Sequence, residues 1–315
     1  MYSIEVNNLT KRFDSFTAVD NISFNVREGE IFGFLGANGA GKSTTIRMLC
    51  GILEPTSGDA IVGGYSIVHD PDRVKLNIGY MSQKFSLYND LTVEENIEFF
   101  GSVYGLYGRT LKEKKDWVLK ISYLKGSENI LTGSLPGGIK QRLALGISVI
   151  HKPKIVFLDE PTSGVDPIYR RNFWELINEL SQEGITVVVT THYLEEAEYC
   201  NNIILIDSGK IIAQGSSKQL KTNYIKNPIL ELESKNILEV IEILEKQDFV
   251  SEVSLFGNNL HIITNEKFSN ISQLNSLLKE KNITPERITT ITPTLEDVFI
   301  HLLEMKKDEE KINEN

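Results

Sequence analysis

The sequence contains few cysteines and no excess of positive charge. Its two cysteines, Cys50 and Cys200, lie far apart and in no spacing that is typical of metal ligands. The formal net charge of −10 provides no basic field that would attract a nucleic-acid backbone. We therefore expect a reducing compartment and no nucleic-acid partner.

Long hydrophobic runs and a secretory signal are absent too. The longest apolar stretches are short runs such as Ile185 to Val189, whereas a membrane-spanning helix needs about 20 such residues. Met1 to Glu5 lack the basic and then apolar pattern of a secretory signal. We expect a cytoplasmic chain with no transmembrane segment of its own, so any membrane-spanning part would belong to another chain.

A glycine-rich stretch stands between an apolar run, Ile31 to Leu35, and a helical pattern that starts at Thr45. Its glycines let the backbone N–H groups point inward, where a polyphosphate accepts hydrogen bonds beside the positive end of the helix. The pattern G-x-x-x-x-G-K-S in this context predicts a nucleotide-binding P-loop rather than a plain turn with a surface lysine. The residues expected to bind the nucleotide here are Gly36, Ala37, Asn38, Gly39, Ala40, Gly41, Lys42, Ser43 and Thr44.

Polar side chains with suitable chemistry accompany the P-loop. Lys42 is expected to reach the β- and γ-phosphates, and the Ser43 hydroxyl to bind Mg²⁺. Asp159 and Glu160 end an apolar strand, which favours metal binding by Asp159 and water activation by Glu160 over surface acids that merely cap a strand. Gln83 also ends a predicted strand, where its amide oxygen would bind Mg²⁺ or orient water; the alternative is a surface glutamine.

Three further features are weaker taken alone. His192 follows a buried strand at the edge where α/β proteins bind ligands, which sets it apart from the other histidines. Gly137 and Gly138 open a helix whose exposed amides favour an anion. Phe13 has a flat apolar face that suits an adenine ring, although such an aromatic is more often part of a core or a turn.

The order of elements predicts two domains and a tail. Antiparallel strands over 3–26 precede an α/β core, and a helical pattern predicts a subdomain inserted at about 84–145. After about Tyr224 the order becomes β-α-β-β-α-β, which is typical of a small ferredoxin-like module. We expect a first domain over 1–222, an accessory domain over 223–304 and a charged tail over 305–315 that frays.

Taken in order, these motifs resemble the ATP-binding subunit of an ABC transporter over essentially all of 1–222. The stretch Leu91 to Asn96, together with Pro293 to Phe299, is more narrowly similar to bacterial exporters of drugs, antibiotics or polysaccharides that carry a C-terminal extension. In family terms the motifs are the A-loop at Phe13, Walker A at 36–44, the Q-loop at Gln83, the signature at 135–139, Walker B at 155–160, the D-loop at 163–166 and the H-loop at His192.

The resemblance implies a P-loop NTPase with a RecA-like core, an antiparallel β subdomain and an inserted helical subdomain, using ATP and Mg²⁺. Two such domains would close head to tail, each ATP lying between one P-loop and the other subunit's signature. Membrane permease subunits would dock near Gln83, at the cytoplasmic face of the inner membrane. The implied roles are Mg²⁺ binding by Ser43, Gln83 and Asp159, general base for Glu160, γ-phosphate sensing by His192, and nucleotide contacts by Gly137, Gly138 and Asp166.

One departure from the family pattern leaves the pairing open. Pro136 stands where the family has serine, and Ile139 where it has glutamine, so at least one γ-phosphate donor is missing. Either the chain forms a slow symmetric homodimer, which we expect as the simpler case, or it pairs with a different ATPase. The alternatives to an exporter are a soluble ABC ATPase and an importer. For the C-terminal module we expect support of the dimer rather than ligand sensing.

Overall fold

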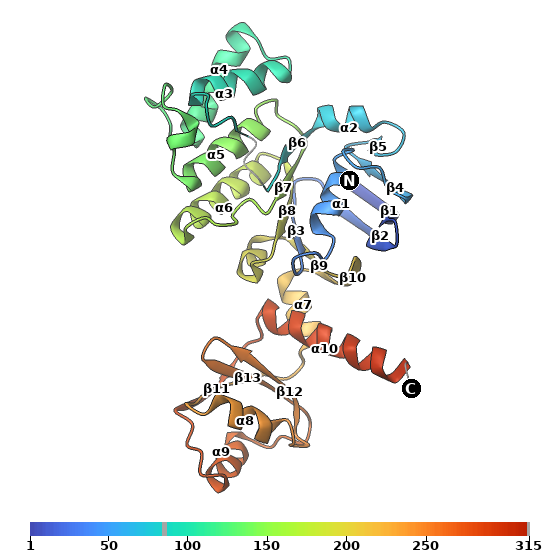
Figure 1. Cartoon of the computed structure of the whole chain (residues 1–315), viewed down its shortest axis with the longest axis vertical. Helices are drawn as coiled ribbons and strands as arrows, with labels where there is room; N and C mark the ends of the chain where they lie inside the picture. The colour runs from blue at the N-terminus through green and yellow to red at the C-terminus, as the bar shows by residue number, and fades with distance from the viewer. Residues whose placement is uncertain (84–86, 314–315) are drawn as a thin grey trace. The chain divides into compact units, whose positions relative to one another are not determined.

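The computed structural model describes residues 1–83 and 87–313 of the chain (Figure 1). It divides into two compact units, Met1–Ser216 and Ser217–Asn315. The division after Ser216 precedes the boundary that we expected after residue 222. Helix α7 (Ser217–Tyr224) belongs to the second unit because it contacts helix α10 (Leu295–Asn313). No helix of the described residues is long and apolar enough to cross a membrane.

Two sheets form the frame of the first unit. The four-stranded antiparallel sheet has the order β2-β1-β4-β5, and the six-stranded sheet has the order β10-β9-β3-β8-β7-β6, with β10 antiparallel to β9 and the other strands parallel. The strands are β1 (Tyr2–Phe13), β2 (Phe16–Arg27), β3 (Ile31–Leu35), β4 (Ser57–Val62), β5 (Tyr65–Ser66), β6 (Ile78–Met81), β7 (Ile155–Asp159), β8 (Thr186–Thr191), β9 (Asn202–Asp207) and β10 (Lys210–Gly215).

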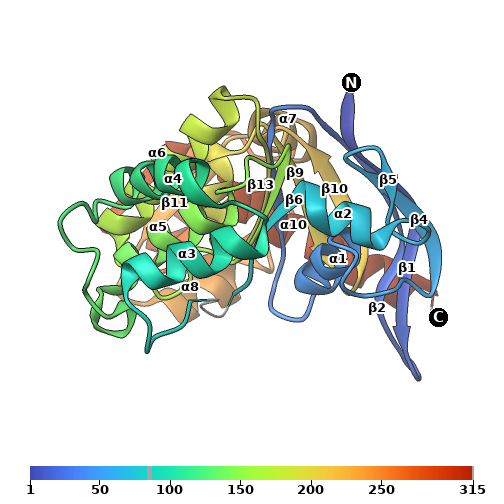
Figure 2. The same ribbon diagram turned by 90° about the horizontal axis from the view of Figure 1, so that it is seen from above.

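Helix α1 (Lys42–Leu49) packs between these sheets (Figure 2). Its buried side chains, including Ile46 and Leu49, share one core with Phe34 of β3 and Phe24 of β2. Burial of this apolar surface from both sheets fixes the start of α1 at the end of β3. The P-loop between them is therefore held by a rigid strand and a rigid helix.

The inserted helical subdomain contains α3 (Val93–Val103), α4 (Gly108–Ile121) and α5 (Gly137–Ser148). Helix α3 begins at the predicted place with a capping box: the Thr92 hydroxyl accepts from Glu95 N at 3.2 Å, and the Glu95 carboxylate accepts from Thr92 N at 2.7 Å. Residues 84–86, at the expected start of the subdomain, lie outside the described residues. The unit also contains α2 (Pro71–Asn77), α6 (Pro167–Gln182) and the short 3₁₀ helices η1 (Thr132–Ser134) and η2 (Leu194–Tyr199).

The second unit has the β-α-β-β-α-β order and an antiparallel sheet of order β12-β13-β11-β14, as in ferredoxin-like modules. Helix α10 runs to Asn313, so the tail that we expected to fray is helical as far as that residue. Charged neighbours stabilise it, as Lys307 Nζ donates to Glu304 Oε1 at 2.6 Å. The remaining elements are β11 (Ile229–Glu233), α8 (Ile237–Leu244), β12 (Val250–Phe256), β13 (Asn259–Thr264), α9 (Ile271–Glu280) and β14 (Arg287–Ile291).

Candidate nucleotide-binding site

The P-loop needs glycine at two positions for steric reasons. A Cβ atom at Gly36 would lie 2.2 Å from the carbonyl oxygen of Ile206, and one at Gly41 would lie 2.5 Å from that of Ala18. Gly41 also has φ 105°, a left-handed conformation that other residues adopt only with strain. The loop is therefore the tight turn that the sequence predicts, and it leads directly into α1.

Lys42 turns back into this loop. Its side chain is buried at 4% exposure, and its Nζ donates to the carbonyl oxygens of Gly36 at 2.8 Å and Ala37 at 3.1 Å. The same Nζ lies 3.5 Å from Glu160 Oε1. A compact ammonium group is thus placed beside the backbone amides that the P-loop directs to phosphates.

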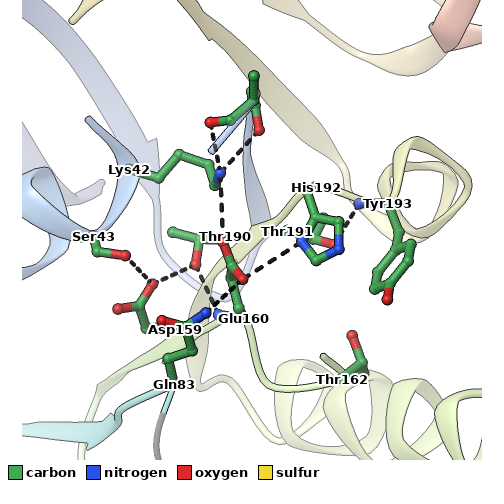
Figure 3. Close-up of polar contacts among 12 residues, drawn as sticks. Lys42, Ser43, Gln83, Asp159, Glu160, Thr162, Thr190, Thr191, His192 and Tyr193 are labelled. Carbon is green, nitrogen blue, oxygen red and sulfur yellow. Dashed lines mark hydrogen bonds and ion pairs between the residues drawn. The ribbon is translucent and has the colours of Figure 1, made fainter. Parts of the chain in front are cut away.

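Glu160 is the point where the predicted catalytic side chains meet (Figure 3). It is 7% exposed, and Gln83 Nε2 donates to its Oε2 at 2.9 Å. His192 Nδ1 lies 3.5 Å from the same oxygen. Together with Lys42, residues from the P-loop, from the end of β6 and from the end of β8 converge on one carboxylate.

Thr190 supports both carboxylates and was missed by the sequence analysis. Its hydroxyl donates to Asp159 Oδ1 at 2.7 Å and accepts from the backbone N–H of Glu160 at 2.8 Å. Ser43 Oγ donates to the same Asp159 oxygen at 2.9 Å. The Glu160 backbone has φ 48°, a strained conformation for a residue with a side chain, and the bond from its N–H helps to hold it.

Asp159 lies close enough to two other ionisable groups to affect their pKa values. Burial is the main cause that raises the pKa of Tyr80 to about 12, and the nearby Asp159 carboxylate is the second. Burial and then Asp159 likewise raise the pKa of the Cys50 thiol well above its usual value. This buried acid therefore creates a negative potential, which suits a cation next to Ser43.

A pocket of about 390 Å³ opens over the P-loop. The aromatic side chain that lines it is Phe16, with 61% exposure, and not Phe13. Phe13 is 45% exposed and has the Lys11 ammonium 5.1 Å from its ring centroid. A nucleotide contact by Phe13 stays a prediction, and Phe16 joins the candidates. The other lining residues are Ala18, Asn38, Gly39, Gly41, Lys42, Ser43, Thr44, Gln83 and Glu160.

The signature and the D-loop do not line this pocket of their own chain. Pro136 precedes α5 without a side-chain capping bond, and the Cβ position of Gly137 faces open space. Gly138 lies against Tyr169, whose ring atoms would be 2.5 Å from a Cβ there. The Asp166 carboxylate instead caps α6. Their contacts with a nucleotide therefore stay predictions that require a second subunit.

The fold and these contacts define a P-loop nucleotide-binding domain with an inserted helical subdomain. The ABC transporter family matches residues 19–163, and a shorter match over 138–196 is to an AAA domain described as a putative AbiEii toxin. The chain is 33% identical to the Nod factor export ATP-binding protein I of Ralstonia nicotianae, covering 95% of this chain and 93% of that protein. The chain belongs to the family of ABC transporter ATP-binding proteins.

Other relatives cover the chain less evenly. It is 53% identical to the probable multidrug ABC transporter ATP-binding protein YbhF of Escherichia coli over 69% of the chain, and it spans only 38% of that protein's length. It is 38% identical to the linearmycin resistance ATP-binding protein LnrL of Bacillus subtilis, over 75% of this chain and 76% of that one. A solved dimeric ATP-binding cassette, in a post-hydrolysis state bound to ADP and Pi, has a TM-score of 0.62 at 26% identity and covers 68% of this chain and 98% of that one.

Proposed function

We propose that this chain is the ATP-hydrolysing subunit of an exporter and powers transport through separate membrane-spanning subunits. The observation that carries the proposal is the convergence of Lys42, Gln83 and His192 on the buried Glu160 carboxylate. Relatives named for multidrug transport, Nod factor export and linearmycin resistance support export. The cargo would be a drug, antibiotic, lipid or polysaccharide.

The chemistry follows from the positions of these groups. Lys42 and the P-loop amides hold the phosphates, so that charge on the γ-phosphate is stabilised by fixed donors. Glu160 accepts the proton of the attacking water, and Gln83 and His192 keep its carboxylate oriented. Positioning and charge stabilisation supply most of the rate enhancement in phosphoryl transfer, which fits a site built from fixed polar groups.

Mg²⁺ fits the donor set beside Glu160. The Ser43 hydroxyl and the Asp159 carboxylate already contact each other, and both are hard oxygen ligands of the kind that Mg²⁺ prefers. The ion would neutralise charge on the phosphate oxygens. Gln83 directs its amide nitrogen at Glu160, and its place among the metal ligands is part of the proposal.

The proposed working unit is a pair of these chains bound to permease subunits at the cytoplasmic face of the cell membrane. A Cβ atom at Gly137, the first residue of α5, would have no atom within 4 Å. The amides of Ile139 and Lys140 each donate to the carbonyl oxygen of Pro136 at 3.0 Å. The amides of Gly137 and Gly138 precede these two at the N-terminus of α5, where the phosphates bound by a second chain would accept from them.

The test is ATP turnover of the purified chain over a range of protein concentrations, alongside Glu160→Gln. Removing the base should lower kcat by about 10²–10⁴-fold and leave ATP affinity within a few-fold. Glu175→Gln, at an exposed position of α6, is the matched control and should behave as the unmodified chain. Turnover that rises faster than linearly with concentration supports the homodimer.

Equal turnover in the unmodified chain and Glu160→Gln would overturn the role of Glu160. No turnover at any concentration would contradict a self-sufficient homodimer and would make co-purification with membrane proteins the next measurement. Recovery of activity by an added second ATPase would establish the heterodimer instead.

A further inference from the structure

A buried carboxylate joins the two loops that carry Glu160 and His192. Glu196 lies in η2 and is 5% exposed. Its Oε2 atom accepts hydrogen bonds from the hydroxyl groups of Thr162 and Thr191, at 2.9 Å each. Thr162 follows Glu160 by two positions, and Thr191 directly precedes His192. One oxygen atom therefore ties the turn after β7 to the end of β8.

Both threonines are fixed within their own loops. Each is 1% exposed. The Thr191 hydroxyl also accepts from Tyr193 N at 2.9 Å. This bond joins the two residues that flank His192. The Thr162 carbonyl oxygen accepts from Val165 N at 3.1 Å, which closes the turn after Glu160. A displacement of either loop would therefore strain the bonds to Glu196.

A second bridge runs between the same two loops. Arg170 of α6 donates from Nε to the carbonyl oxygen of Val165 at 2.9 Å. Its guanidinium carbon lies 4.1 Å from the ring centroid of Tyr193, and that ring lies 4.1 Å from the His192 ring. The two loops are thus joined at two places, and Glu196 forms the buried one.

Stability alone does not account for a carboxylate at this position. Within the described part of the chain, Glu196 Oε1 is buried and has no hydrogen-bond partner. A buried acceptor without a partner costs about 1–3 kcal/mol, and apolar side chains of similar volume often replace buried charges without loss of stability. The oxygen that does bond is the one that joins the loops.

We propose that Glu196 is a positioning residue that couples the turn 161–166 to His192. This inference rests on the proposed ATPase function. By fixing the two loops to each other, Glu196 keeps the Glu160 carboxylate and the His192 imidazole at one separation while the phosphate is attacked. Catalytic groups lose rate when they are displaced by about 1 Å, so loss of this tie lowers kcat more than it raises KM.

The test compares Glu196→Met, which removes the acceptor at similar length, with Glu196→Gln, whose amide oxygen can still accept from both hydroxyls. We expect kcat for ATP to fall about tenfold in Glu196→Met, KM to change less than about twofold, and Glu196→Gln to retain most of the activity. Glu195→Met, on the exposed side of η2, is the matched control and should leave kcat unchanged. Unchanged kcat in Glu196→Met would overturn the proposal, as would a Glu196→Gln variant that is no better.

Variants of the donors keep the proposal testable where Glu196→Met does not fold. Thr162→Val and Thr191→Val each remove one hydroxyl, and their effects on kcat should be non-additive because both act through one oxygen. Hydrogen exchange gives a readout without turnover: Thr162→Val should speed exchange at 191–193, in the other loop, and unchanged exchange there would overturn the tie. Failure of the proposed function is distinct, since it appears as absence of Glu160-dependent turnover in the unmodified chain.

Discussion

Each unit of the chain buries a cluster of histidine and carboxylate groups, but the two clusters use their polar atoms differently. In the first unit, Glu160 contacts Lys42, Gln83 and His192 and lines a pocket of about 390 Å³. In the second unit, His261 Nδ1 bonds to Asp297 Oδ1 at 2.7 Å. The ring of Phe256 stacks on the His261 imidazole, with the two ring centroids 3.8 Å apart.

In the second cluster, the histidine side chains pair with carboxylates of the same unit. His261 Nε2 also lies 3.7 Å from Glu231 Oε2, and a second pair joins His301 Nδ1 of α10 to Glu252 Oε2 of β12 at 2.9 Å. These pairs hold α10 against one face of the sheet, while α8 and α9 cover the apolar face. A pocket of about 390 Å³ also opens beside Glu252 and His301, but these two groups are paired with each other. The Glu160 carboxylate instead gathers side chains from three segments of the first unit, and this convergence distinguishes the two clusters.

Among the changes that test this comparison, Asp297→Ala in the second cluster has the largest expected effect. Asp297→Ala removes the partner of the buried His261 and a bond that Asp297 Oδ2 accepts from Thr294 N at 2.7 Å. Breaking a buried pair by removing one partner costs about 3 kcal/mol or more, so peptides from β11 and β13 should exchange hydrogen roughly a hundredfold faster. Hydrogen exchange with mass spectrometry measures this change.

The same variant tests the separation of the two clusters. ATP turnover per folded chain should be unchanged in Asp297→Ala, because the contacts of Asp297 lie within the second unit. Asp248→Ala, at a position with 89% side-chain exposure and a 3.6 Å pair to Lys267, is the matched control and should leave exchange unaltered. A large loss of turnover in Asp297→Ala would contradict the comparison.

Acid should weaken the second cluster more gradually. Burial raises the pKa of Asp297, but hydrogen bonds from His261 and Thr294 together lower it by more than burial raises it. The pKa of Asp297 therefore lies below the usual 3.8. A carboxyl whose pKa is lower in the folded state stabilises that state above 3.8 and loses this effect as the pH falls through the folded value. The difference in urea midpoint between the unmodified chain and Asp297→Asn should therefore shrink below pH 4. A difference that stays constant with pH would contradict this.

Pro136→Ser tests whether the first unit lacks a donor for its ligand. The serine restores an N–H and a hydroxyl at the start of α5, and a hydrogen bond to a charged group contributes about 1.5–3 kcal/mol. Turnover of the chain alone should rise roughly tenfold. Pro136→Ala restores the N–H without the hydroxyl and separates the two contributions. No gain with serine would favour the reading in which a partner ATPase supplies the intact signature.

The sequence predicts the parts of the site that are contiguous in the chain. The P-loop and the pair Asp159-Glu160 combine particular residue types at a fixed spacing along the chain, so their roles could be proposed from the sequence. Thr190 and Glu196 could not, because their partners lie in other segments: Thr190 reaches Asp159 only through the parallel register of β7 and β8. Long-range pairing of this kind is not written in local periodicity.

The aromatic contact to the nucleotide base, Phe13 or Phe16, could not be chosen from the sequence either. Substitution of these two residues has the smallest expected effect. The two residues pair directly across the β1–β2 hairpin, which places both side chains on one face, so the alternation of the sequence does not separate them. Phe16 lines the pocket because it lies on β2, which also contributes Ala18 to the lining. Phe16→Ala should raise KM for ATP about fivefold, since stacking on a base contributes about 1 kcal/mol, while Phe13→Ala should change KM less than twofold. Both side chains are largely exposed, so neither change should shift the melting temperature by much. The reverse order of KM values would restore Phe13 as the adenine contact and would place Phe16 outside the site.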